Sequence, residues 1–302
     1  MDNLRGSLLM VLAMAGFSLE DTLIKLMASA LPTGQVVAMI GLGGTVTFTA
    51  LTLLQGQRVH SSAFFATPVM LRNLGEMIAT AGFVTAIVLT TLSSAAAILQ
   101  AAPLAVTVGA ALVLGEYVGW RRWAAIGVGF CGVLLIIQPG LAGFAPASLF
   151  AVVGVAGLAL RDLAVRRIPA TVTSAQLSLW SFVVVIPTGV LMMAAMGDGP
   201  VIPGWLDLAR LGAAMVVGGL GYYAIVAASR IGEVAVVVPF RYSRLVFALI
   251  LGALVFGERP DALMLSGAAL VVTAGLYTIW RETHLARRRT VEPAPERDST
   301  WP

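Results

Sequence analysis

Residues 111–117 read Ala-Leu-Val-Leu-Gly-Glu-Tyr, and residues 253–259 read Ala-Leu-Val-Phe-Gly-Glu-Arg. The two stretches share five of seven residues at an offset of 142. Further matches keep their order along the chain at an offset of 141. They pair Ser7 with Ser148, Val11 with Val152, Gly16 with Gly157, Asp21 with Asp162, and Gln35 with Gln176. The sequence therefore predicts an internal duplication that covers most of the chain.

The composition indicates where the two copies fold. Hydrophobic residues make up 59% of the 302 residues and charged residues only 11%, whereas soluble domains carry about 25% charged residues. Apolar runs close to the length of about 20 residues that crosses a bilayer recur throughout. We therefore expect an all-α membrane protein with ten transmembrane helices. The predicted spans are residues 6–29, 34–54, 69–90, 93–114, 122–138, 147–167, 174–196, 206–228, 233–256 and 262–281.

Each copy holds five spans, and this odd number fixes the relation between the copies. The second copy must cross the membrane in the opposite sense, which gives two inverted five-helix repeats at residues 1–143 and 144–282. Many secondary transporters follow this plan, with the substrate site near the midplane between the repeats, although some channels share it. Residues 283–302 are polar and contain prolines, so we expect a disordered tail.

The positions of the basic residues predict the orientation. The loops on one side of the predicted membrane contain Arg58, Arg121 and Arg166, and the arginine-rich tail lies on the same side. The loops on the opposite side contain one arginine, Arg259. The positive-inside rule then places both termini in the cytoplasm of a bacterial inner membrane. The net charge of +4 thus reflects topology and does not indicate nucleic-acid binding.

The first span carries several charges, which are costly inside a membrane. Asp21 and Lys25 are spaced i, i+4, as are their counterparts Asp162 and Arg166, so each couple can form a structural ion pair on one helix face. Glu20 has no such local partner, and its counterpart in the second copy is an arginine. Glu20 is therefore either a functional carboxylate or a structural one with a distant partner.

Two further spans contain charged candidates for a substrate pathway. Glu76 follows Arg72 by four residues and can pair with it. The ninth span holds Arg241, Tyr242 and Arg244 near the middle of the membrane. These arginines require carboxylates or a substrate anion as partners. The segment either touches the transport pathway or locks the two repeats together through buried charges.

Prolines and uncharged polar or aromatic residues complete the candidate set. Pro103 frees a backbone carbonyl near the middle of the fourth span, beside Gln100. Pro239 lies in the ninth span, and the two prolines are candidate hinges. Three aromatic residues either line a cavity or serve only in packing: Trp180, Tyr222 and Tyr223. The single cysteine and the two histidines lie in separate segments, which favours neither a metal site nor a disulfide.

Several motifs occur in a familiar order: the Leu-Gly-Glu and Phe-Gly-Glu ends at 114–116 and 256–258, Val-Pro-Phe-Arg-Tyr at 238–242, and the last apolar stretch at 275–282. In these motifs and in its duplicated ten-span plan, the chain resembles the EamA-type branch of the drug/metabolite transporter superfamily over residues 6–282. The resemblance implies an inner-membrane transporter of small organic solutes without a cofactor, similar to exporters of amino acids, aromatic ones among them, or related metabolites. We interpret Glu116 and Glu258 as caps or repeat-interface residues.

Three classes of function remain open. The first is a monomeric or homodimeric transporter that exports amino acids or related small metabolites from the cytoplasm across the lipid bilayer by alternating access. A variant of it is proton-coupled efflux of cationic drugs with Glu20 as the exchanging carboxylate. The second class is a channel or scramblase. The third is a membrane-embedded transferase, against which the short loops and the lack of paired histidines argue, so we expect no enzyme.

Overall fold

The computed structural model describes residues 2–291 except residues 60, 142, 170 and 232, and this part of the chain is helical throughout apart from its connections. The first copy contains α1 (Asp2–Met27), α2 (Thr33–Leu54), the 3-10 helix η1 (Ser62–Phe65), α3 (Thr67–Leu89), α4 (Leu92–Leu99), α5 (Ala102–Val113) and α6 (Trp120–Ile137). The second copy contains α7 (Ser148–Val165), α8 (Ser174–Met196), α9 (Trp205–Ile231), α10 (Val234–Val237), the 3-10 helix η2 (Val238–Tyr242), α11 (Ser243–Phe256) and α12 (Ala262–Val291).

The helices have the length and composition of membrane spans. In the described part of the chain, nine helical segments are long and apolar enough to cross a membrane. The helix α3 is also 23 residues long, carries Arg72 and Glu76, and packs against α7 and α8. The protein is thus a multi-pass membrane protein, and the predicted all-α fold of two inverted five-helix repeats is confirmed.

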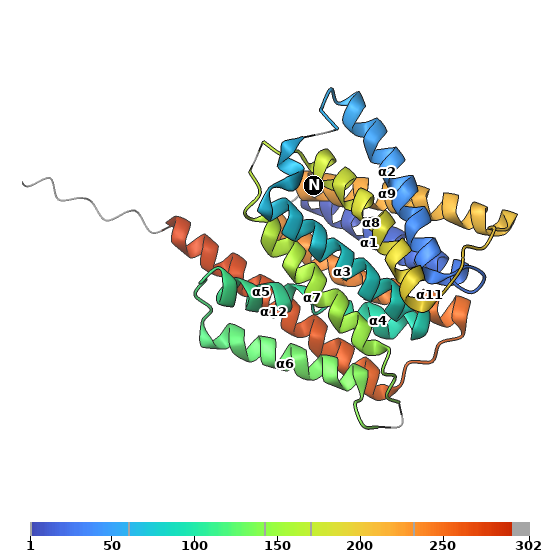
Figure 1. Cartoon of the computed structure of the whole chain (residues 1–302). Helices are drawn as coiled ribbons and strands as arrows, with labels where there is room; N and C mark the ends of the chain where they lie inside the picture. The colour runs from blue at the N-terminus through green and yellow to red at the C-terminus, as the bar shows by residue number, and fades with distance from the viewer. Residues whose placement is uncertain (1, 60, 142, 170, 232, 292–302) are drawn as a thin grey trace, which may run out of the picture.

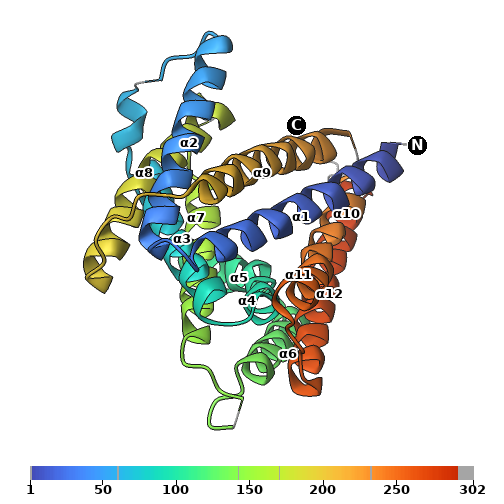
Figure 2. The same cartoon turned by 90° about the vertical axis from the view of Figure 1, so that its right-hand side faces the viewer.

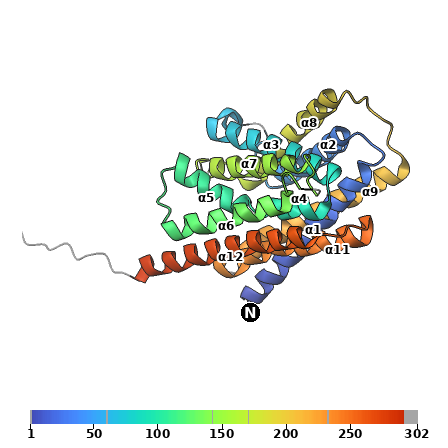
Figure 3. The same ribbon diagram turned by 90° about the horizontal axis from the view of Figure 1, so that it is seen from below.

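The packing of the helices repeats between the two copies. The helix α1 runs beside α9, and α3 runs beside α7 (Figures 1 and 2). Since α1 corresponds to α7 and α3 to α9, these two contacts are equivalent under an internal two-fold rotation. Two other contacts join counterparts directly: α2 packs on α8, and α6 lies beside α12 (Figure 3). The two copies therefore interlock along their whole length.

Glycines allow these helices to approach closely. A Cβ atom placed on Gly157 of α7 would lie 2.4 Å from the backbone nitrogen of Ala79 on α3. A Cβ atom on Gly132 of α6 would lie 2.6 Å from the carbonyl oxygen of Gly267 on α12. Helices in lipid associate through such close van der Waals contact between small residues. The glycines of the apolar spans therefore determine which helices pair.

The fourth and ninth spans are both interrupted. The fourth is divided between α4 and α5, and the ninth between α10, η2 and α11. Pro103 lies in the first turn of α5, and Pro239 lies in the first turn of η2. In the fourth span, Gln100 and Ala101 keep right-handed helical backbone angles but leave the regular α-helix, because proline cannot continue the hydrogen-bond ladder of the preceding turn. The hinge role of the two prolines stays a prediction.

The start of α1 and the end of α12 lie at the same end of the helix bundle. Figure 2 shows the start of α1 and the end of α12 together at the upper right. We call this the terminal end and the opposite one the distal end. The helix α12 continues to Val291, beyond residue 283, where the predicted tail begins. Residues 292–302 of that tail lie outside the described residues.

Candidate functional site

The charges of the first and ninth spans meet at the contact of α1 with α11. Two guanidinium nitrogens of Arg244 donate to Oδ2 of Asp21, at 2.7 and 3.3 Å. The hydroxyl of Ser18, one turn earlier on α1, donates to the carbonyl oxygen of Arg244 at 3.1 Å. The guanidinium also lies over the rings of Phe17 and Phe83, 5.6 and 5.4 Å from their centroids. Arg244 therefore joins α1, α3 and α11 through a neutralised, well-packed charge.

A second group of charges lies between α3 and α7. Glu76 lies 3.8 Å from a guanidinium nitrogen of Arg72 and 3.6 Å from one of Arg161. The Arg72–Glu76 pair expected from the sequence is confirmed. Arg161 also binds Asp162 at 2.8 Å, and Arg72 donates to the hydroxyl of Ser181 on α8. Here the two repeats are linked by a network in which each arginine has an acidic partner.

Two more ion pairs join the ends of helices, and they are equivalent under the internal two-fold relation. Lys25 of α1 binds Glu258, after α11, with 3.1 Å between Nζ and Oε1. Arg166, after α7, binds Glu116, after α5, at 2.7 Å. Lys25 and Arg166 are counterparts, as are the two glutamates. We call Lys25–Glu258 the distal pair and Arg166–Glu116 the terminal pair, after the ends where they lie.

The distal and terminal pairs correct one prediction. The sequence suggested that Lys25 and Arg166 pair with the aspartates four residues before them on the same helix, and this prediction is wrong. Each cation instead pairs with a glutamate that follows a different span, because the contact forms only when the helices pack.

 Lys25 and Glu258 are 233 positions apart, and Arg166 and Glu116 are 50 positions apart, so local spacing does not reveal either contact.

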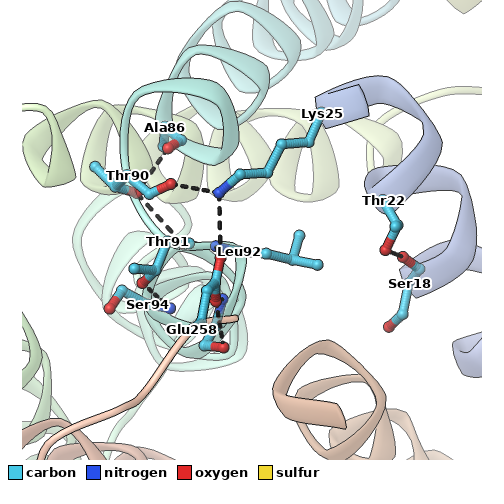
Figure 4. A network of polar contacts seen from close by, with 10 residues as sticks. Ser18, Thr22, Lys25, Ala86, Thr90, Thr91, Leu92, Ser94 and Glu258 are labelled. Atoms are coloured by element: carbon cyan, nitrogen blue, oxygen red, sulfur yellow. Dashed lines mark hydrogen bonds and ion pairs between the residues drawn. The ribbon is translucent and has the colours of Figure 1, made fainter. Parts of the chain in front are cut away.

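The distal pair is buried and closes the space between α1, α4 and α11. The carboxylate of Glu258 accepts hydrogen bonds from the backbone N–H of Leu92 at 2.6 Å and from the N–H and hydroxyl of Ser93 at 3.0 and 2.6 Å. It therefore caps the N-terminus of α4. Lys25 also donates to the carbonyl oxygen of Thr90 at 2.6 Å (Figure 4). Burial raises the pKa of Glu258, but the hydrogen bonds from Ser93 and Leu92 and the nearby Lys25 outweigh it and hold that pKa below its usual range.

The two pairs differ in their surroundings. The side chains of Lys25 and Glu258 are 14% and 5% exposed, whereas those of Arg166 and Glu116 are 46% and 48% exposed. Equivalent residues thus occupy a closed environment at the distal end and an open one at the terminal end. The two repeats therefore have different conformations although their sequences correspond.

Glu20 and Arg241 lie well inside spans and have no ion pair or side-chain hydrogen bond to any described residue. Glu20 packs against α9, where a Cβ atom on Gly218 would lie 2.7 Å from its carboxyl carbon. Arg241 is exposed although it lies well inside the ninth span. Its carbonyl oxygen is 3.4 Å from the amide nitrogen of Gln100. Gln100 and Arg241 belong to the fourth and ninth spans, which correspond in the two repeats, so this contact joins the repeats.

Two of the predicted pathway residues contact neighbouring elements of the protein. The hydroxyl of Tyr242 is buried without a hydrogen-bond partner among the described residues, and it lies against Gly275 of α12. Trp180 is also buried. Its indole donates to the carbonyl oxygen of Val59 at 3.3 Å, and its ring packs edge-on against Phe64. The structure thus places both side chains in packing contacts outside the charged groups described above.

The two adjacent tyrosines of α9 point in different directions. Tyr222 shares a hydrogen bond of 2.7 Å with Ser178 on α8 and packs edge-on against Phe48 on α2. Tyr223 is 73% exposed. Of these two candidates, Tyr222 thus serves in packing between helices, while Tyr223 points away from them. The sequence analysis did not identify Arg161 as a site residue. Arg161 occupies the position in the second copy that Glu20 occupies in the first, and this change from an acid to a base could have indicated it.

Comparison with known proteins agrees with this architecture. The model of the EamA-like transporter family matches residues 4–138 and 145–280. The chain belongs to this family. A riboflavin transporter of Rhizobium johnstonii is 29% identical over 294 residues, which cover 94% of this chain and 93% of that protein. A pseudopaline exporter of Pseudomonas aeruginosa is 28% identical over 278 residues, covering 89% and 94% of the two chains.

Other relatives share part of the EamA chain or its fold alone. An S-adenosylmethionine uptake transporter of Rickettsia bellii is 27% identical over 180 residues, covering 60% of this chain and 61% of that protein. A solved crystal structure superimposes with a TM-score of 0.57 over 95% of this chain and 98% of the other. At 18% sequence identity, that likeness concerns the fold alone.

Proposed function

We propose that this EamA-family transporter carries an amino acid or a related small metabolite across a bacterial inner membrane by alternating access. The observation that supports the mechanism is the contrast between the buried distal pair and the exposed terminal pair. In an inverted repeat, the two halves can exchange conformations around a fixed central site. That exchange would bury Arg166–Glu116 and expose Lys25–Glu258.

The orientation in the membrane is part of this proposal. The excess of arginines at the terminal end favours a cytoplasmic location for both ends of the chain. In that orientation the conformation described above is closed toward the periplasm by the distal pair and more open toward the cytoplasm. A carrier in this state takes up its substrate from the cytoplasm, as an exporter must.

The identity of the substrate is the finer part of the proposal. The relatives quoted above are named for riboflavin, S-adenosylmethionine and pseudopaline, so they agree on small organic metabolites. S-adenosylmethionine itself carries an α-amino-acid group, which supports an amino acid or a related compound as the substrate. The most specific form of this proposal is an aromatic amino acid as the substrate, which the sequence resemblance favours.

A second candidate function is proton-coupled efflux of cationic drugs. The unpaired carboxylate of Glu20 favours it, because an acid without a partner is free to exchange a proton or a cation. Uptake into proteoliposomes with and without an imposed pH gradient tests this function. If it is correct, uptake of a cationic drug requires the gradient in the wild type and loses that requirement in Glu20→Gln. Uptake that is unaffected by the gradient contradicts proton coupling.

Crosslinking at the two ion pairs tests alternating access. In a Cys131→Ser background, one variant carries Lys25→Cys with Glu258→Cys, and a matched variant carries Arg166→Cys with Glu116→Cys. A reducible bifunctional thiol reagent should stop saturable amino-acid uptake in both variants, and a reductant should restore it. Full uptake by completely crosslinked protein would contradict alternating access and favour a channel.

A further inference from the structure

Arg241 is a cation that has no acidic partner in the part of the chain that the structure describes. Arg244 is neutralised by Asp21, and Arg72 and Arg161 share Glu76. No described acid lies within ion-pair distance of Arg241. An uncompensated charge inside a membrane protein is costly and occurs where a function requires it. The guanidinium therefore remains available to a ligand.

The position of Arg241 is also the one at which an inverted repeat binds its substrate. The contact of its carbonyl oxygen with the side-chain amide of Gln100 places it where the fourth and ninth spans of the two repeats meet. The half-helices α5 and α11 begin beside these residues, at Ala102 and Ser243. Arg241 thus lies at the interface between the repeats, where transporters of this plan bind their substrates.

The side chain is accessible and has other charges around it. Arg241 is exposed, and it lies within electrostatic reach of Asp162, Arg161 and Arg244. The arginines among these neighbours are already held by acids, and the spacing of Arg241 from Asp162 exceeds that of an ion pair. A buried charge lock between the repeats would require a direct carboxylate contact, which the described residues do not provide.

We propose that Arg241 binds a carboxylate group of the transported substrate, with the amide of Gln100 as an additional hydrogen-bond donor. The inference rests on the proposed transport function and narrows the substrate to carboxylate-bearing metabolites. A guanidinium forms two parallel hydrogen bonds with a carboxylate, which gives both affinity and orientation. Esters and amides of the same compounds lack the negative charge and lose this interaction.

Uptake into proteoliposomes, measured by mass spectrometry against empty liposomes, tests the proposal with four defined pools. The pools are free L-amino acids, N-acetyl-L-amino acids, L-amino acid methyl esters, and N-acetyl-L-amino acid amides supplemented with riboflavin. We expect uptake from the two carboxylate-bearing pools and none from the ester and amide pools. Uptake from the ester or amide pool alone would contradict the carboxylate proposal and leave the transport function intact. No uptake from any pool would contradict both.

Variants of Arg241 complete the experiment. Arg241→Gln should reduce carboxylate-dependent uptake about ten- to a hundredfold, as expected for loss of a charged hydrogen bond, and Arg241→Lys should retain part of it. Arg259→Gln, in an exposed loop, is the matched control and should leave uptake unchanged. Size-exclusion chromatography identifies variants that fail to fold. Wild-type uptake of carboxylates by folded Arg241→Gln would overturn the proposal.

Discussion

Charged residues in the spans fall into two groups according to their partners. Asp21 and Arg244 neutralise each other across two helices and are packed by aromatic rings. Glu20, adjacent to Asp21 in the chain, has no such partner among the described residues. Neutralising one member of a buried ion pair leaves the other charge without compensation. Neutralising a buried charge that has no partner removes an uncompensated charge instead. The two neighbouring acids should therefore respond oppositely to neutralisation.

Glu20→Gln should leave the thermal midpoint of the detergent-purified protein unchanged or raise it. Asp21→Asn is the matched change and should destabilise the protein by about 3–5 kcal/mol, because Arg244 then lacks its counter-charge. Thermal unfolding followed by intrinsic fluorescence compares the two variants. Equal destabilisation by both would show that Glu20 is as structural as Asp21.

At the scale of the helices, close packing and interruption serve different purposes. The pair α3 and α7 approaches through Gly157 with no room for a side-chain atom, which makes their contact rigid. The fourth and ninth spans contain short turn or 3-10 segments near the contact of Gln100 with Arg241, where regular α-helical hydrogen bonding is interrupted. Rigid pairs and broken spans together form a scaffold in which movement would be concentrated at the breaks.

Gly157→Ala should destabilise the protein by about 1–3 kcal/mol, since the added methyl group must displace the backbone of α3. Gly127→Ala on α6 is the control, because a Cβ atom there meets nothing within 4 Å. It should be neutral or slightly stabilising. The measurement is again the thermal midpoint, and similar effects of the two substitutions would argue against close packing of α3 on α7.

At the scale of the whole molecule, the two repeats differ most clearly in their end contacts. The distal pair is enclosed and supported by the N-terminus of α4, while the terminal pair is open to its surroundings. A buried ion pair stabilises the fold when the hydrogen bonds of both groups are satisfied. An exposed ion pair contributes only about 0–1 kcal/mol to the free energy of unfolding. The stability of this conformation should therefore depend far more on one end than on the other.

Glu258→Gln should lower the thermal midpoint clearly, whereas the equivalent Glu116→Gln should change the stability by less than about 1 kcal/mol. The effect of Glu258 depends on pH. Because its folded-state pKa is lowered, its charge stabilises the fold above the unfolded pKa of about 4.3. That stabilisation is lost as the pH falls through the lower folded-state value.

Thermal unfolding of the wild type and Glu258→Gln between about pH 3 and pH 8 measures this dependence. The difference between their midpoints should be constant at neutral pH and shrink below about pH 4. A difference that stays constant down to the acid end of the range would show that the charge of Glu258 does not stabilise the fold. Equal effects of Glu258→Gln and Glu116→Gln would remove the contrast between the two ends.

The sequence by itself determined the membrane environment, the number of spans and the inverted duplication. Apolar runs of spanning length and matches at one offset are local or periodic properties of the sequence. They can therefore be recognised without knowing how the helices pack. The Arg72–Glu76 pair was predictable for the same reason, because its spacing on one helix brings the side chains together.

Only the tertiary structure decided the partners of the remaining charges. Lys25 reaches Glu258, and Arg244 reaches Asp21, across more than 200 residues of chain, so helix packing and not local spacing selects them. The same packing leaves Arg241 without an ion pair to any described acid and brings its carbonyl oxygen to Gln100 of the other repeat. In a helical membrane protein, the partner of a charged side chain depends on which helix faces pack together. Close contacts at small residues, such as those of the paired glycines, determine which faces do so.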